Sequence, residues 1–206
     1  MIEFHTAHTS NGQRVAIALE ECALPYRAYR YALVKGEHRT GAFEALNPAG
    51  MIPVIVDPDG PGGASLTLTQ SGAILHYLAE KTGRFIPEDA LVRARMHEWT
   101  MFALTDVATA SAGIFVHSAL VPERSPANVG WYEERLLRFL RVADARLARH
   151  EWLAGELTIA DFALYPVVAL RSGLVDAAGE FPNLVRWRDA LGARPAVVRG
   201  MSVADE

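Results

Sequence analysis

The sequence contains a single cysteine, Cys22, among its 206 residues. One cysteine excludes an internal disulfide, and it excludes a Cys-x-x-Cys pair that cycles between dithiol and disulfide forms. We therefore expect a reducing compartment, and any disulfide chemistry must use a sulfur atom from another molecule. Cys22 also falls on the apolar face of an expected helix, which indicates a core position rather than a reactive one.

An excess of positive charge is missing too, since 20 Lys and Arg residues stand against 24 Asp and Glu residues. Phosphate binding depends on dense positive charge, so we expect no nucleic-acid partner. No stretch approaches the roughly 20 apolar residues of a membrane span, and the N-terminus has no signal-peptide pattern. These absences predict a soluble cytoplasmic protein without a membrane partner.

Metal-ligand clusters and common nucleophile motifs are absent as well. The seven histidines are scattered, and His5 and His8 do not belong to a larger set of ligands, so no metal site is expected. The sequence has no Gly-x-Ser-x-Gly elbow and no phosphate-binding loop.

The sequence does contain a change of pattern near residue 84. Before it, the order is β-α-β, an irregular link, then β-β-α, with strands expected at 2–4, 26–33, 52–57 and 64–68 and helices at 11–23 and 71–81. After it every pattern is helical, with helices expected at 91–120 and 127–150, from the capping box Thr158-Ile-Ala-Asp161, and at 182–193. We expect an α/β domain (1–83), a linker (84–90) and an all-α domain (91–206).

The first candidate site is Thr9-Ser10-Asn11-Gly12, between the first strand and the first helix. Its ordinary interpretation is a turn with an N-cap, because these side chains accept hydrogen bonds from end amides. Its functional interpretation is an anion site, because a helix N-terminus offers free amides and the positive end of the helix dipole. A thiolate held there would have its pKa lowered from about 8.5 into the physiological range.

The second candidate site is the segment from Asn47 to Pro53, Asn-Pro-Ala-Gly-Met-Ile-Pro. Proline cannot donate a hydrogen bond to a neighbouring strand, so its place at the start of a strand is unusual. We expect a cis bond at Pro53 that turns the backbone amide and carbonyl of Ile52 towards a ligand. The alternative is a simple edge strand.

Two more polar groups lie near expected helix and loop positions. In Thr69-Gln70-Ser71-Gly72, Ser71 is either an N-cap or a ligand for a carboxylate, and Gln70 offers both a donor and an acceptor. The segment 35–39 reads as a solvated loop in which His38 or Arg39 could hold a second carboxylate.

Taken together, these motifs and the capping box resemble a glutathione transferase over essentially the whole chain. The resemblance implies a thioredoxin-like N-terminal domain with a cis-Pro53, an all-helical C-terminal domain and a homodimer. Within the superfamily, Thr9-x-Asn11-Gly12 and the Lys35-Gly36 loop are most similar to the bacterial nu-class group, related to the yeast nitrogen-regulator prion protein. Members of that group reduce disulfides with glutathione.

The resemblance also implies roles around the glutathione sulfur. Thr9 and Asn11 would polarise the sulfur, and the backbone of Ile52, held by Pro53, would pair with the cysteinyl part. Ser10 remains a rival for the activating hydroxyl. The sequence has no tyrosine before Tyr26, so the tyrosine-type activation of the mammalian classes is excluded.

Further implied roles concern the two ends of glutathione. Gln70 and Ser71 would hold the γ-glutamyl carboxylate, although nu-class proteins usually have Glu at the first of these positions. His38 would hold the glycyl carboxylate, where Met51 replaces a polar or basic residue and weakens the expected grip. Asp106 is either a contact to the partner subunit's glutathione amine, as in the family, or a solvated helix charge.

The resemblance thus predicts an enzyme that uses bound glutathione as a co-substrate, without a metal. The thiolate would attack a disulfide sulfur or an electrophilic carbon, and the nu-like motif favours the disulfide. Phe102, Phe115 and His117 are the candidate pocket for the second substrate, with ordinary core packing as the alternative. A glutathione-transferase fold kept as a binding or regulatory module, without catalysis, is the alternative function.

Overall fold

The computed structural model describes residues 1–204 and divides into two compact units. The first unit consists of Met1–Arg84 together with the segment from Ala193 onward, and the second consists of Phe85–Gly192. The segment after Gly192 was expected in the second domain. It lies with the first unit because helix α10 (Pro195–Ser202) packs on α1 (Ser10–Glu21).

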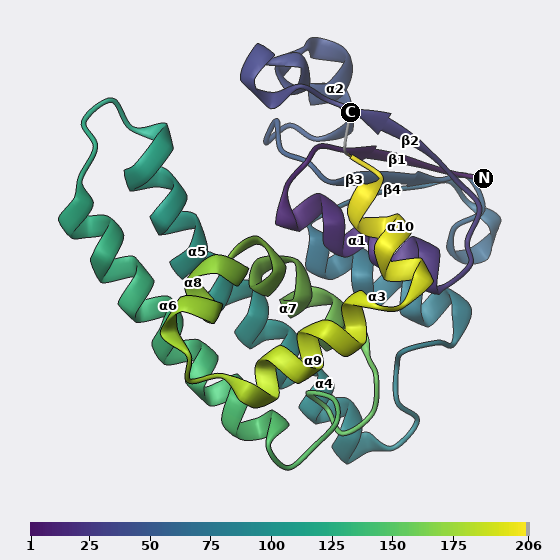
Figure 1. The fold of residues 1–206 in the computed structure, drawn as a ribbon. Coiled ribbons are helices and arrows are strands. Elements are labelled where there is room, and N and C mark those ends of the chain that lie inside the picture. The colour runs from purple at the N-terminus through teal and green to yellow at the C-terminus, as the bar shows by residue number, and fades with distance from the viewer. Residues whose placement is uncertain (205–206) are drawn as a thin grey trace. The chain divides into compact units, whose positions relative to one another are not determined.

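The first unit is built on a four-stranded sheet in the order β2-β1-β3-β4. The strands are β1 (Ile2–Thr6), β2 (Tyr26–Arg30), β3 (Val54–Asp57) and β4 (Leu66–Thr69). β1 is parallel to β2 and antiparallel to β3, and β3 is antiparallel to β4. The other helices are α2 (Gly41–Leu46) and α3 (Ser71–Thr82), with 3-10 turns at Leu33–Lys35, Glu37–Arg39 and Pro61–Gly63 (Figure 1). This is the expected thioredoxin-like arrangement.

Neighbouring residues of β1 face the two sides of the sheet. Phe4 is fully buried and its ring meets the edge of Tyr26 at 6.0 Å between centroids. His5 stacks on Tyr29 at 4.8 Å and approaches Phe43 of α2 at 6.2 Å. Helices α1 and α3 lie together on the face of the sheet opposite α2 (Figure 1).

Helix α10 packs closely on the backbone of α1. A Cβ atom at Gly200 would lie 2.7 Å from the Cα atom of Ile17, so no larger residue fits there without a shift. The guanidinium of Arg194 donates to both carboxylate oxygens of buried Glu21, at 2.6 and 2.8 Å. This two-point ion pair fixes the end of α1 against the start of α10.

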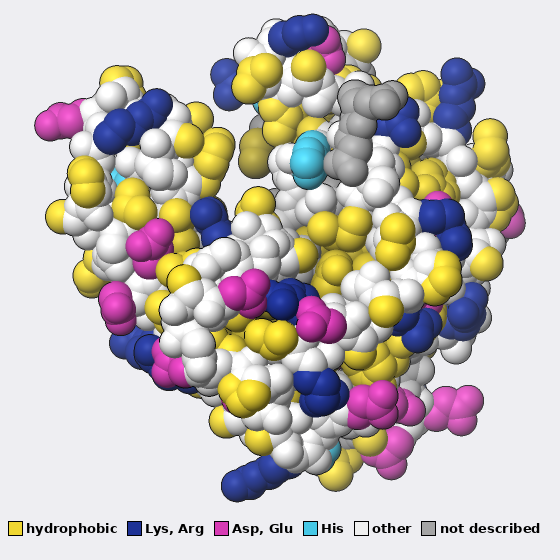
Figure 2. All heavy atoms as spheres, in the orientation of Figure 1, with side chains coloured by type: hydrophobic (Ala, Val, Ile, Leu, Met, Phe, Trp, Pro, Cys, Tyr) yellow, Lys and Arg dark blue, Asp and Glu magenta, His cyan; other side chains and the backbone are white. Residues whose placement is uncertain are grey.

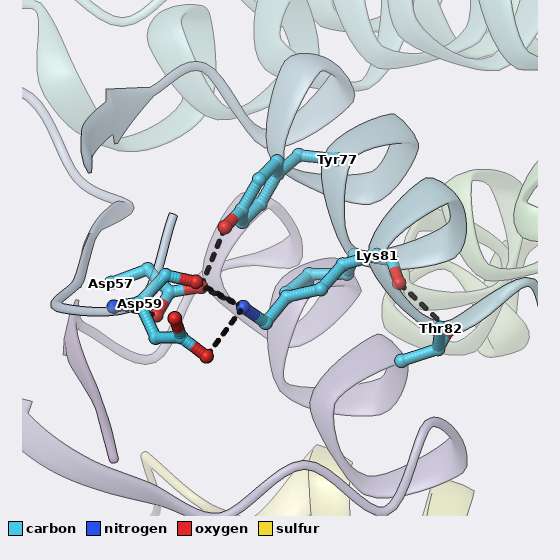
Figure 3. A network of polar contacts seen from close by, with 6 residues as sticks. Asp57, Asp59, Tyr77, Lys81 and Thr82 are labelled. Atoms are coloured by element: carbon cyan, nitrogen blue, oxygen red, sulfur yellow. Dashed lines mark hydrogen bonds and ion pairs between the residues drawn. The ribbon is translucent and has the colours of Figure 1, made fainter. Parts of the chain in front are cut away.

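A polar network joins the end of β3 to α3 (Figure 3). The buried carboxylate of Asp57 accepts hydrogen bonds from the Tyr77 hydroxyl at 2.6 Å and the Asp59 amide at 3.0 Å, and pairs with Lys81 at 3.0 Å. Burial opposes ionisation, but the Tyr77 hydroxyl, the amide and the ammonium outweigh it and lower the pKa of Asp57. The network holds α3 in a fixed position on the sheet.

The second unit is entirely helical in the described residues, as expected. Its helices are α4 (Ala90–Phe102), α5 (Ala108–Phe115), α6 (Pro126–Leu147), α7 (Ile159–Leu170), α8 (Ser172–Ala178) and α9 (Pro182–Gly192). Two π-helical turns, Ala103–Val107 and Val116–Leu120, extend α4 and α5 into one helix over residues 90–120. Gly113 allows close packing of α5 on α6, because a Cβ atom there would lie 2.3 Å from the Tyr132 ring.

The helix over residues 90–120 would be able to cross a membrane if length and composition alone were considered, with a hydropathy of 1.3 over its apolar window. The expectation that no stretch approaches a membrane span is therefore wrong by these two measures. Its segments pack on α6 and α7, and apolar residues are the usual choice for a helix in the core of a soluble protein. Packing inside the second unit covers part of this helix, since 39% of its apolar window is buried.

Surface charge is mixed in sign. On the face drawn in Figure 2, acidic and basic side chains are intermingled with apolar ones. This distribution agrees with the near balance of 20 basic against 24 acidic residues in the sequence.

The capping box at the start of α7 is present and extends into a buried cluster. Asp161 accepts hydrogen bonds from the Thr158 amide at 3.0 Å, the Leu153 amide at 3.1 Å and the Trp187 indole at 2.9 Å. Burial raises the pKa of Asp161 to about 6, even though these donors favour the carboxylate. Asp161 therefore joins α7 to the preceding loop and to α9, which is a folding role.

Replacing Asp161 with alanine is expected to lower the free energy of unfolding by about 3–5 kcal/mol, because several buried donors lose their acceptor. Asp161→Asn keeps one acceptor oxygen and should cost less. Urea unfolding followed by circular dichroism measures both changes. The exposed Glu156→Ala is the control, with a change within about 0.5 kcal/mol; an equally small change for Asp161→Ala would contradict the assignment.

Candidate functional site

The turn between β1 and α1 places Thr9 at the N-cap of the helix. Its backbone is extended (φ −145°, ψ 154°), and its hydroxyl oxygen accepts a hydrogen bond from the Gly12 amide at 3.2 Å. Thr9 rather than Ser10 therefore caps the helix. Because the oxygen acts as an acceptor here, the hydroxyl proton remains available to donate to an anion.

Asn11, two residues after Thr9, is exposed, and Arg14 orients its side chain. A guanidinium nitrogen of Arg14 donates to the side-chain oxygen Oδ1 of Asn11. Arginine has only donors, so this contact assigns the oxygen to Arg14 and leaves the Nδ2 amide hydrogens of Asn11 on the other side. The N-terminal end of α1 thus carries two side-chain donors, on Thr9 and Asn11.

Arg14 itself is the residue that the sequence analysis missed. Only 1% of its surface is exposed, and burial lowers its pKa to about 10, so the guanidinium stays charged at neutral pH. Its spacing from Asn11, three residues along a helix, was the available signal, because residues i and i+3 are neighbours on a helix surface.

Gly12 is required by the close approach of the turn to the helix. A Cβ atom at this position would lie 2.3 Å from the Thr6 hydroxyl oxygen and 2.6 Å from the Ala7 carbonyl oxygen. The carbonyl belongs to the backbone and cannot move aside cheaply. A larger residue would therefore push apart the turn that presents Thr9 and Asn11.

The bond between Ile52 and Pro53 is cis, as predicted. Asn47 braces the loop before it, because its side chain donates to the Met51 carbonyl at 2.6 Å and accepts from the Ala49 amide at 3.1 Å. The Ile52 side chain is buried, while its backbone amide and carbonyl form no hydrogen bond with residues 1–204. Both backbone groups are free for a ligand. The Met51 side chain is 59% exposed.

The start of α3 is shaped by strained backbone at Gln70. Its φ of 69° and ψ of 114° lie in a region that residues other than glycine rarely adopt, at a cost of about 1–3 kcal/mol. Gln70 takes the N-cap position, and Ser71 is the first helical residue, so the ordinary interpretation of Ser71 as the N-cap is wrong. The Gln70 side chain does not cap the helix, which leaves the end amides of α3 for a ligand.

His38 lies in the 3-10 turn Glu37–Arg39, next to the loop that ends at Pro53. Its carbonyl oxygen is 3.8 Å from a Cβ built on Gly50. The ring is 8% exposed, and its Nδ1 atom has no hydrogen-bond partner within residues 1–204. A buried nitrogen without a partner is costly, and a ligand carboxylate would supply one. Arg39, the alternative to His38, is exposed.

Two of the three candidates for the second-substrate pocket, Phe102 and Phe115, lie far apart. Phe102 packs edge-on against Trp99 at 5.3 Å and Phe139 at 5.9 Å, whereas Phe115 is 53% exposed. Phe102 and Phe115 are thirteen residues apart on the helix over residues 90–120, which is about 20 Å along its axis. The structure does not gather them into one pocket.

The remaining second-unit candidates are His117 and Asp106. His117 stacks on Tyr132 at 5.6 Å, and its Nδ1 atom lies 3.4 Å from the side-chain amide of Asn128. Asp106 lies in the first π-helical turn and accepts a hydrogen bond from the Thr105 hydroxyl at 3.0 Å. The roles expected for both residues stay predictions.

Cys22 is buried at 6% exposure, close to the Thr82 hydroxyl. Burial raises the pKa of its thiol, although the Thr82 hydrogen bond opposes this. A thiol in this environment is a poor nucleophile. Within residues 1–204 no group of three or more His, Cys, Asp or Glu residues could hold a metal ion.

Residues 9–81 match the family described as "Glutathione S-transferase, N-terminal domain", and residues 112–195 match "Glutathione S-transferase, C-terminal domain". The disulfide-bond oxidoreductase YfcG of Escherichia coli is 34% identical over 199 residues, which cover 95% of this chain and 92% of that protein. The disulfide-bond oxidoreductase YghU of the same organism is 33% identical over 217 residues, covering 98% and 74%.

Solved structures agree with these sequence matches. A glutathione transferase from Burkholderia graminis, with two glutathione molecules bound per subunit, has a TM-score of 0.91 at 37% identity and covers 98% of this chain and 88% of that chain. A glutathione transferase from Pseudomonas putida, with one glutathione disulfide bound per subunit, has a TM-score of 0.91 at 30% identity, covering 98% and 91%. The chain belongs to the glutathione S-transferase family.

Proposed function

We propose that the protein is a glutathione-dependent disulfide oxidoreductase in which Thr9 and Asn11 stabilise the thiolate of bound glutathione. The observation that carries the proposal is the pair of side-chain donors at the N-terminus of α1. The acceptor atoms of Thr9 and Asn11 are used by Gly12 and Arg14, so the hydrogens of both remain for an anion. Donors aimed at a developing anion lower a thiol pKa and raise the thiolate fraction at neutral pH.

The rest of the tripeptide is held by three features of the first unit. The free backbone groups of Ile52 pair with the cysteinyl part, in the manner of a short strand. Gln70, Ser71 and the uncapped end of α3 hold the γ-glutamyl carboxylate, since free amides and a helix dipole favour an anion. The buried ring of His38 holds the glycyl carboxylate, and Met51 adds no polar contact there.

The proposed reaction consumes two glutathione molecules for each disulfide. The first thiolate attacks one sulfur of the substrate, the S–S bond breaks, and the other half leaves as a thiolate that takes a proton from water. A second glutathione thiolate attacks the glutathione sulfur of the mixed disulfide and releases the second thiol. The products are glutathione disulfide and two substrate thiols. Two relatives support this order, one with two glutathione molecules bound per subunit and one with glutathione disulfide.

Two features of the chain's own chemistry support the assignment. Cys22 is the only cysteine, and its buried thiol has a raised pKa, so the reacting sulfur belongs to the bound peptide.

Conjugation to an electrophilic carbon would use the same thiolate, and the match to YfcG and YghU favours the disulfide. From the family resemblance we further propose a cytoplasmic homodimer.

The first prediction concerns substrate choice. With reduced glutathione, kcat/KM for 2-hydroxyethyl disulfide should exceed that for 1-chloro-2,4-dinitrobenzene by at least about tenfold, because a thiolate attacks a disulfide sulfur readily. Steady-state assays with both substrates measure the ratio. The reverse ratio identifies a conjugating transferase. Silence on both substrates, with glutathione bound by calorimetry, identifies a binding module.

A second prediction concerns the two donors. The double variant Thr9→Ala/Asn11→Ala should lose about 10²–10³ in kcat/KM at neutral pH, the usual effect of removing donors from a developing anion. Activity should recover partly as the pH is raised, because the thiolate then forms without help. The exposed strand variant Thr67→Ala is the matched control. A double variant with full activity at neutral pH would rule out this mechanism of activation.

A third prediction concerns the cysteine. Cys22→Ala should keep kcat/KM for the disulfide within about twofold while losing roughly 1 kcal/mol of stability, because the thiol fills core space and carries no chemistry. Assays and urea unfolding of the same preparation separate the two effects. A tenfold or greater loss of activity with normal glutathione binding would place Cys22 in the reaction.

A further inference from the structure

We propose that Arg14 is a positioning residue that holds the Asn11 amide with its Nδ2 hydrogens towards the glutathione sulfur. The inference rests on the function proposed above and assigns a role to a residue outside the set of expected site residues. Its geometric basis is the hydrogen bond from the Arg14 guanidinium to Oδ1 of Asn11.

The orientation of an asparagine side chain is ambiguous when nothing holds it. Asn11 is exposed, and an exposed amide can present either its carbonyl or its NH₂ group to a ligand. A carbonyl would repel a thiolate, whereas an NH₂ group would stabilise it. Arg14 offers donors only, so it selects the carbonyl and leaves NH₂ for the sulfur. Orientation before the ligand arrives is what makes such a donor effective.

The place of Arg14 in α1 also bears on the adjacent site. It is the fifth residue of α1, near the positive end of the helix dipole, where a cation is disfavoured. Its side chain is also almost fully buried, and burial of a guanidinium has a desolvation cost. The first turn of α1 contains no acidic residue. A positive charge in this position would favour an anion bound at the adjacent site.

The surroundings of the Asn11 side chain are rigid. The backbone around Asn11 is held by the Thr9 cap and by the close approach of Gly12 to the Ala7 carbonyl. Arg14 extends from the same helix, and its side chain is almost fully buried. Burial restricts the position of the guanidinium that donates to Asn11. The side chain of Asn11 is the remaining free element, and the Arg14 contact fixes it.

The test measures the thiol pKa of bound glutathione from the ultraviolet absorbance of the thiolate as a function of pH. Arg14→Met should raise this pKa by about one unit and lower kcat/KM about tenfold at neutral pH, while the glutathione Kd changes less than about threefold. Arg14→Lys keeps a charged donor and should restore most of the effect. Arg27→Met, which removes an exposed arginine and the same charge, is the control and should change neither quantity.

A double-mutant cycle separates positioning from an independent effect of charge. If Arg14 acts through Asn11, the double variant Asn11→Ala/Arg14→Met should match Asn11→Ala within about twofold in kcat/KM. A further tenfold loss when Arg14→Met is added to Asn11→Ala would overturn the proposal.

Asn11→Asp tests the orientation without a change in the interior. It keeps the acceptor for Arg14 and replaces NH₂ with a carboxylate oxygen, so it should raise the thiol pKa more than Asn11→Ala does. An equal or smaller rise would show that NH₂ does not face the sulfur. Because position 11 is exposed, this variant carries the test even where Arg14→Met does not fold.

The titration of the wild-type protein distinguishes a failure of the proposed function from a failure of the role assigned to Arg14. A bound glutathione with the thiol pKa of the free peptide would overturn both the proposed function and this inference. A lowered wild-type pKa that persists in Arg14→Met would overturn the inference alone and leave the function standing.

Discussion

The close approach of Gly12 to the Ala7 carbonyl is the constraint on which the first unit's chemistry depends. A Cβ atom would stand 2.6 Å from that oxygen, so only glycine lets β1 turn directly into α1. The tight turn makes Thr9 the cap and brings Asn11 out at the first turn of the helix. Thr9 and Asn11 then stand at the end of α1 where the helix dipole also favours an anion.

Packing elsewhere in the first unit keeps this helix end in register with the other site segments. The carboxylate of Asp57 ties the last residue of β3 to Tyr77 and Lys81 of α3. Val54 of β3 pairs with Thr69 of β4, so the Ile52–Pro53 bond just before β3 and Ser71 at the start of α3 lie at the same end of this strand pair. Helix α10 clamps α1 from outside the sheet through Gly200. The ligand groups are therefore positioned by core packing.

The sequence predicted the succession of strands and helices along the first unit, the cis bond and the capping box, because each depends on neighbours in the chain. Proline at a strand start and Thr158 with Asp161 are local signals. It did not predict α10, whose place on α1 depends on the contact between Gly200 and Ile17, far apart in sequence. The separation of Phe102 from Phe115 follows from their spacing on the expected helix 91–120, and it was missed because these residues were chosen by type alone.

Arg14 and Asp161 show why burial of charge alone does not identify a functional residue. Both are almost completely buried. Asp161 accepts hydrogen bonds from donors inside the protein, on Thr158, Leu153 and Trp187, so its partners are all structural. Arg14 makes a bond that leads outward, to the exposed side chain of Asn11 at the N-terminal end of α1, which favours anions. For Arg14 it is this outward bond to a site residue, and not the burial of its charge, that supports a role in the site.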